Sequence, residues 1–111
     1  MIEGIYTVHL TGRADHGVVM FVLSQGKIAG ADLNGLVYSG HYTSSEDLIE
    51  GVVTFTMPAE STMITGISFP NGPTEIRVPI RLPKVISPSV TYLVQTPIGP
   101  INAKFVKNVE L

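Results

Sequence analysis

Cysteine is absent from this chain of 111 residues, which excludes disulfide bonds and thiolate chemistry. The absence is consistent with a reducing compartment, so we expect a cytoplasmic protein. Basic residues are scarce as well: the seven Lys and Arg side chains form no run, and the net charge is −2. Nucleic-acid binding needs a positive surface that displaces counterions from phosphates. We therefore predict no direct contact with nucleic acid.

Charged residues of either sign are few. They make up 14% of the chain, compared with about 25% in a typical globular protein. Much of the surface must then be neutral or apolar, which favours an oligomer or a binding face over a well-solvated monomer. We predict a homodimer.

Long apolar runs are missing too. The longest, residues 18–23, is far below the roughly 20 residues that a membrane-spanning helix needs. Near the start of the chain, Glu3, Thr7 and His9 interrupt the apolar character that a signal peptide would have. We predict neither a membrane segment nor a signal peptide.

The sequence also lacks the patterns of known catalytic and metal sites. The histidines, His9, His16 and His41, form no His-x-x-x-His pair, and there is no cysteine to complete a zinc site. No Gly-x-Ser-x-Gly motif and no phosphate-binding loop is present. We predict that the protein is not an enzyme and holds no metal or cofactor.

Short alternating or apolar runs separated by turn residues fill the chain, while a 3.6-residue period is nowhere sustained. This pattern is typical of an all-β protein with little or no helix. The expected strands cover residues 4–10, 17–24, 27–33, 36–43, 48–57, 62–69, 75–82, 90–96 and 101–109. Eight of these nine segments are expected to be main strands, which predicts a single domain over residues 1–111 that forms an eight-stranded antiparallel β-barrel.

Residues 75–82 show the cleanest alternation, with aliphatic side chains at every second position. The positions that alternate with these aliphatic side chains are expected to point outward, and they are Glu75, Arg77, Pro79 and Arg81. Because proline has no N–H, we expect this strand at a sheet edge, at a bulge or beside a gap in the barrel.

The segment 26–42 is unusually rich in glycine, which predicts bends or close backbone approach. We assign Gly30, Asp32, Gly35 and Gly40 as structural turn residues. Asn34-Gly35 predicts a hairpin with a type I′ turn. Asp32 is expected to accept backbone N–H groups and to fix a bend.

Two further surfaces follow from the apolar pattern. Residues 17–24 are apolar on both faces of the expected strand, so we place the dimer interface there, with Val19 and Phe21 as its contacts. In residues 48–57, Val53, Phe55 and Met57 are expected to point inward. They allow an alternative function, in which the barrel carries a small apolar ligand.

Four short motifs carry a family resemblance: Glu3-Gly4-Ile5-Tyr6, Gly26-x-x-x-Gly30-Ala31-Asp32, Tyr38-x-Gly40-x-Tyr42 and Ala103-Lys104-Phe105-Val106. Together they resemble the GrlR-like family of negative regulators of type III secretion. The resemblance implies an eight-stranded, lipocalin-like β-barrel that dimerises. It also implies a non-enzymatic regulator that sequesters a transcriptional activator.

In that family an acidic run after the fourth strand contacts the activator. The matching positions here read Ser44-Ser45-Glu46-Asp47, so Glu46 and Asp47 are the partner-binding residues that the resemblance implies. From the residues alone, the favoured interpretation of this segment is a solvated loop that keeps the protein soluble, ahead of an acidic contact for a basic partner.

Overall fold

A computed structural model describes residues 2–33, 35–57, 61–62, 68–69, 74–97 and 99–111. These residues form strands and loops without any helix, as predicted. The strands are β1 (Gly4–Thr11), β2 (His16–Ser24), β3 (Lys27–Asp32), β4 (Val37–Ser44), β5 (Leu48–Met57), β6 (Ser61–Thr62), β7 (Ser68–Phe69), β8 (Thr74–Pro83), β9 (Thr91–Thr96) and β10 (Gly99–Glu110).

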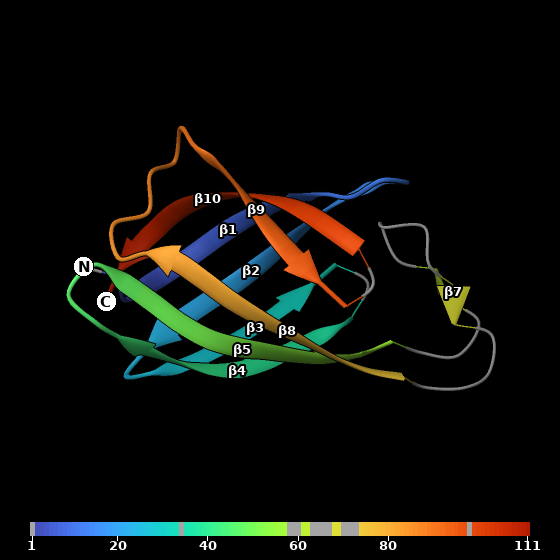
Figure 1. Cartoon of the computed structure of the whole chain (residues 1–111), viewed down its shortest axis with the longest axis horizontal. Coiled ribbons are helices and arrows are strands. Elements are labelled where there is room, and N and C mark those ends of the chain that lie inside the picture. The colour runs from blue at the N-terminus through green and yellow to red at the C-terminus, as the bar shows by residue number, and fades with distance from the viewer. Residues whose placement is uncertain (1, 34, 58–60, 63–67, 70–73, 98) are drawn as a thin grey trace.

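Eight of these strands form one antiparallel sheet in the order β8-β5-β4-β3-β2-β1-β10-β9. The sheet is rolled into a nearly closed barrel, with both chain termini at the same end (Figure 1). The predicted all-β, eight-stranded barrel is therefore confirmed.

The barrel has a seam between β8 and β9. These two strands are the ends of the sheet, and they lie next to each other without pairing in the residues that the structure describes (Figure 1). Pro79 is on β8 and lies opposite Val52 of β5. Strand β8 pairs with β5 only, so its other edge has no paired strand in the residues described. The expectation that Pro79 marks an edge beside a gap is confirmed, because a missing N–H costs nothing on the unpaired edge.

Alternation along the strands separates the interior from the surface. On β8, Ile76, Val78 and Leu82 are buried, while Arg77 and Arg81 between them are exposed. The other strands contribute in the same way to a core inside the barrel. Its buried members are Ile2, Tyr6, Val8, Val19, Leu23, Ile28, Tyr38, Tyr42, Ile49, Val53, Phe55, Ile76, Val78, Leu82 and Ala103.

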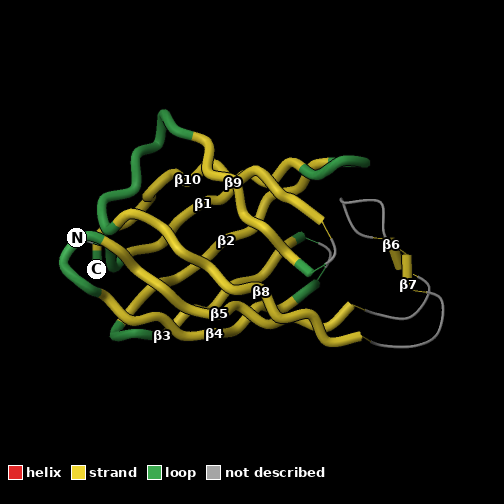
Figure 2. The backbone as a smooth tube through the Cα atoms, viewed as in Figure 1, coloured by secondary structure: helices red, strands yellow, loops and turns green. Residues whose placement is uncertain are grey.

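One predicted strand is wrong. Residues 62–69 were expected to form a single strand, but Ser61–Thr62 and Ser68–Phe69 are separate short strands that pair antiparallel with each other. The β6–β7 pair lies beyond the end of the barrel opposite the termini (Figure 2). The polar residues between short apolar positions allow either arrangement, and sequence alternation alone does not distinguish them.

The hairpin between β2 and β3 has the tightest turn of the glycine-rich segment. Ser24 pairs with Lys27, and the two residues between them, Gln25 and Gly26, have φ of 50° and 78°. Positive φ at both central positions defines a type I′ turn, which matches the right-handed twist of the flanking strands. The Gly26 carbonyl also accepts the N–H of Tyr42, 2.8 Å away, and so joins this turn to β4.

The hairpin between β3 and β4 differs from its prediction by one position. The Gly35 N–H donates to the Asp32 carbonyl at 3.2 Å, which makes Gly35 the last residue of the turn and not a central one. The type I′ turn centred on Asn34-Gly35 is therefore wrong, and Asn34 itself lies outside the described residues. Asp32 does fix the bend as expected, because its Oδ1 accepts the Leu36 N–H at 3.0 Å.

Gly30 and Gly40 are not turn residues, which corrects the assignment made from the sequence. Both lie within strands, at points where another part of the molecule comes close. A Cβ on Gly30 would lie 2.6 Å from the Phe21 ring, and a Cβ on Gly40 would overlap the carbonyl oxygen of Val52 on β5. These glycines allow close packing inside the sheet.

Candidate functional site

The interior of the barrel holds a small apolar cavity of about 110 Å³. Phe21, Val53 and Phe55 line it, and so does Ala103. Val53 and Phe55 were predicted to point inward, and they do. The side chain of Met57, the third predicted ligand contact, lies outside the described part of the structure.

The polar groups in this cavity wall are already bonded within the protein. The Tyr38 hydroxyl donates to Asp32 Oδ2 at 3.1 Å, and the Thr96 hydroxyl donates to the Gly99 carbonyl at 2.5 Å. Burial, followed by the charge of Asp32 and the hydrogen bond to it, raises the pKa of the Tyr38 hydroxyl. A cavity of this kind offers a ligand van der Waals contact and few polar partners.

The Val19 and Phe21 side chains correct the predicted dimer interface. Val19 is only 2% exposed, and Phe21 packs against the core and lines the interior cavity. Because strand side chains alternate between faces, the outward side of β2 carries Val18, Met20 and Val22, which are 38%, 45% and 36% exposed. We call these three side chains the β2 face.

The apolar character of the β2 face continues onto both neighbouring strands. Val22 is opposite Ile5 on β1 and opposite Ala29 on β3, while Met20 is opposite Ala31. The patch therefore extends across three adjacent strands without a charged side chain at its centre.

The acidic loop, residues 45–47, joins β4 to β5 and is fully on the surface, as predicted. Ser45 and Leu48 hold its base: the Ser45 N–H donates to the Leu48 carbonyl at 2.8 Å, and the Leu48 N–H donates to Ser45 Oγ at 3.3 Å. The Asp47 carbonyl accepts the N–H of Lys84, 2.9 Å away. The backbone is thus fixed at both ends, while the carboxylates of Glu46 and Asp47 face solvent.

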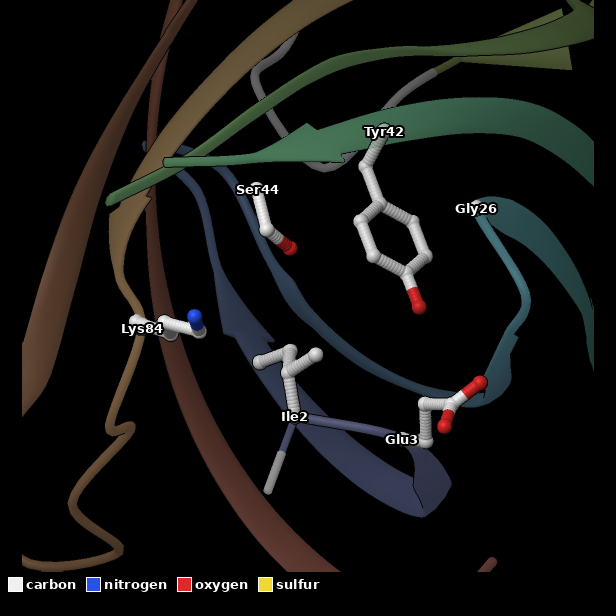
Figure 3. Close-up of a pocket in the computed structure, with 6 residues that line it drawn as sticks. All are labelled: Ile2, Glu3, Gly26, Tyr42, Ser44 and Lys84. Atoms are coloured by element: carbon white, nitrogen blue, oxygen red, sulfur yellow. The ribbon is translucent and has the colours of Figure 1, made fainter. Parts of the chain in front are cut away.

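A second, larger hollow opens at the end of the barrel that carries the termini. This end pocket has a volume of about 470 Å³. Its lining residues are Ile2, Glu3, Gly26, Tyr42, Ser44 and Lys84, and Figure 3 shows them arranged around one space.

Hydrogen bonds fix the walls of the end pocket. Glu3 Oε2 accepts the N–H of Gln25 at 2.6 Å, which ties the start of the chain to the β2–β3 turn. The Tyr6 hydroxyl donates to the Ile2 carbonyl at 2.5 Å and holds Ile2 across this end of the barrel. Tyr42 is buried, at 6% exposed, and its hydroxyl points into the pocket (Figure 3).

Comparison with known proteins gives no relative. No family model, curated protein or solved structure matches the chain. Within the described residues, no helix is long and apolar enough to cross a membrane. The same residues contain no group of three or more His, Asp or Glu side chains arranged to hold a metal ion.

Sequence reasoning did not find the end pocket. Its lining comes from the chain start, the β2–β3 turn, the end of β4 and the end of β8, and only the barrel brings these together. The residues carry no spacing motif. Glu3, Gly26 and Tyr42 do fall within the motifs of the family resemblance, but those motifs did not indicate a pocket.

Proposed function

We propose that this protein is a non-enzymatic, cytoplasmic regulator that binds a transcriptional activator through Glu46 and Asp47, in the manner of GrlR-like regulators of type III secretion. The acidic loop carries the proposal. Its backbone is held by Ser45, Leu48 and Lys84 while both carboxylates are exposed. Fixed, solvent-facing charges raise the association rate and the specificity for a basic partner surface. The eight-stranded antiparallel barrel is also the fold that the resemblance implies.

A charge-neutral variant of the loop tests this function. Tagged wild-type protein and Glu46→Gln/Asp47→Asn are used to capture partners from a lysate of the source cells, and bound proteins are identified by mass spectrometry. We expect the wild type to retain a transcriptional activator and the variant to lose it. Glu50→Gln, which removes an exposed carboxylate from the outer face of β5, is the matched control and should retain the activator.

The experiment distinguishes a wrong binding site from a wrong function. Retention of the activator by the double variant contradicts the site, and failure of the wild type to retain any activator contradicts the function. The double variant should unfold within about 0.5 kcal/mol of the wild type, because exposed loop substitutions rarely change stability more.

We further propose that the protein is a homodimer that associates through the β2 face. Val18, Met20 and Val22 supply an apolar patch on a chain with few charges, and such patches mark protein contacts. Size-exclusion chromatography with light scattering should give twice the chain mass for the wild type and a monomer for Met20→Glu. Val85→Glu, at an 85% exposed valine of the β8–β9 loop, should stay dimeric. A dimeric Met20→Glu variant would exclude this face.

The alternative function is that of a carrier for a small apolar ligand. The apolar interior cavity favours it, but a volume of about 110 Å³ is well below the roughly 300–1,000 Å³ of typical ligand pockets. A guest no larger than benzene would fit without widening the barrel. Native mass spectrometry should then show an added mass that is lost on denaturation, whereas a mass equal to the bare chain or its dimer contradicts the carrier.

A further inference from the structure

We propose that the end pocket binds a small zwitterion, specifically a free α-amino acid, with the ligand ammonium on Glu3 and the ligand carboxylate on Lys84. This site adjoins the acidic loop, because the Lys84 N–H donates to the Asp47 carbonyl, and it is distinct from the interior cavity.

The charges of the pocket are complementary to such a ligand. Glu3 and Lys84 line the pocket on opposite sides, and the Glu3 carboxylate is turned toward the β2–β3 turn (Figure 3). A ligand with a single charge would satisfy only one of them. A molecule that carries both an ammonium and a carboxylate pairs with both, and charge-assisted hydrogen bonds are the stronger class.

The Tyr42 hydroxyl is an independent indication of a ligand. The tyrosine is buried and its hydroxyl faces the pocket, yet it makes no hydrogen bond to any residue that the structure describes. A buried hydroxyl is costly unless it is bonded. With the Ser44 hydroxyl, which points into the same space, it can donate to the oxygens of a ligand carboxylate (Figure 3).

The size and rigidity of the pocket fit a small molecule. Its volume of about 470 Å³ lies within the range of ligand pockets. Ile2 lies between Glu3 and Lys84 and offers an apolar contact for an amino-acid side chain (Figure 3). The Glu3 carboxylate is held by the Gln25 N–H, and the Lys84 backbone is held by its bond to Asp47, so the main chain around the pocket needs little ordering when the ligand binds.

Nuclear magnetic resonance titration of the whole chain tests the proposal. The probe is L-leucine, and the two half-probes are isovalerate, which has only the carboxylate, and isoamylamine, which has only the ammonium. We expect saturable amide shifts at Gly26, Ser44 and Lys84 with L-leucine. Each half-probe should bind at least about tenfold more weakly, because it loses one charged hydrogen-bonded contact.

Variants assign the contacts. Glu3→Gln keeps the acceptor for the Gln25 N–H but removes the charge, and Lys84→Met keeps the aliphatic stem. Each should weaken L-leucine binding at least about tenfold, and Tyr42→Phe should weaken it by a smaller factor. Lys104→Met, at an exposed lysine on β10, should bind like the wild type.

Two results would overturn the proposal. One is the absence of saturable shifts with L-leucine in protein whose spectrum is that of a folded chain. The other is equal affinity for L-leucine in the wild type, Glu3→Gln and Lys84→Met. Because no protein partner enters the experiment, its outcome is independent of the regulatory function proposed above.

Discussion

At position 40, a hydrogen atom in place of a methyl group decides whether β4 and β5 can pair. A Cβ there would overlap the backbone of Val52, which cannot move without breaking the ladder between the two strands. Gly35 is required for another reason. A Cβ at this position would meet no neighbouring atom, but the φ of 84° is one that residues with a side chain rarely adopt. One glycine is required by packing and the other by conformation.

The two glycines predict different losses of stability. Gly35→Ala should lower the free energy of unfolding by about 1 kcal/mol, the cost of a left-handed conformation for alanine. Gly40→Ala should lower it by about 3 kcal/mol, because the added methyl overpacks a strand pair. Urea unfolding of both variants measures the difference, and a Gly40→Ala variant as stable as Gly35→Ala would contradict the close approach.

Tyr38 predicts a loss of stability at alkaline pH. Its folded-state pKa is raised above the ordinary value by burial and by Asp32, so the folded state keeps a proton that the unfolded chain releases above about pH 10. The contribution of Tyr38 to the free energy of unfolding is fully present below that pH. The free energy of unfolding falls as the pH rises toward the raised pKa, by up to about 1.4 kcal/mol per pH unit. Chemical denaturation between pH 9 and pH 11.5 should show a shallower decline for Tyr38→Phe than for the wild type. Equal slopes would contradict this assignment.

At the scale of elements, the β2–β3 hairpin uses a residue poorly suited to its turn. Gln25 has a φ of 50°, where asparagine is several-fold enriched. Gln25→Asn creates the Asn-Gly pair that type I′ turns prefer and should raise the free energy of unfolding by about 0.5 kcal/mol. Gln95→Asn, at an exposed position within β9, is the control and should not stabilise. Thermal unfolding of both variants measures the effect.

The elements were largely predictable because alternation is a local property. Short alternating or apolar runs predicted the eight barrel strands, and the missing N–H of Pro79 predicted an edge, a bulge or a gap, of which the structure shows the edge beside the seam. The inward face of β2 was not predictable, since Val18 and Val19 are equally apolar and only the pairing with β1 and β3 determines which is buried. The β3–β4 turn was misplaced by one residue for a similar reason. Asp32 bonds both Leu36 and Tyr38, and this side-chain network outweighs the preference of Asn34-Gly35.

At the scale of the whole molecule, the candidate sites depend on closure of the barrel. The acidic loop could be located in the sequence because it lies within one segment. The interior cavity and the end pocket could not, because their walls come from strands that are far apart in the chain.

Filling the interior cavity should stabilise the barrel. Ala103 is fully buried and lines the cavity. Ala103→Val therefore adds two carbon atoms to the wall of a cavity of about 110 Å³. We expect a gain of about 1 kcal/mol in the free energy of unfolding. Ala29→Val adds the same atoms on the outer face of β3 and serves as the control. A destabilised Ala103→Val variant, measured by urea unfolding, would mean that the cavity wall cannot accept larger side chains.

The seam between β8 and β9 gives the barrel a direction in which it opens. The sheet is a strip with two edges, and within the described residues these edges lie close together without pairing. Thermal breathing should therefore begin there, as an unrolling of the strip that leaves the central ladders intact. Amide protons on β8 and β9 would exchange with deuterated water sooner than those on β2 and β3, which have a hydrogen-bonded neighbour on both sides.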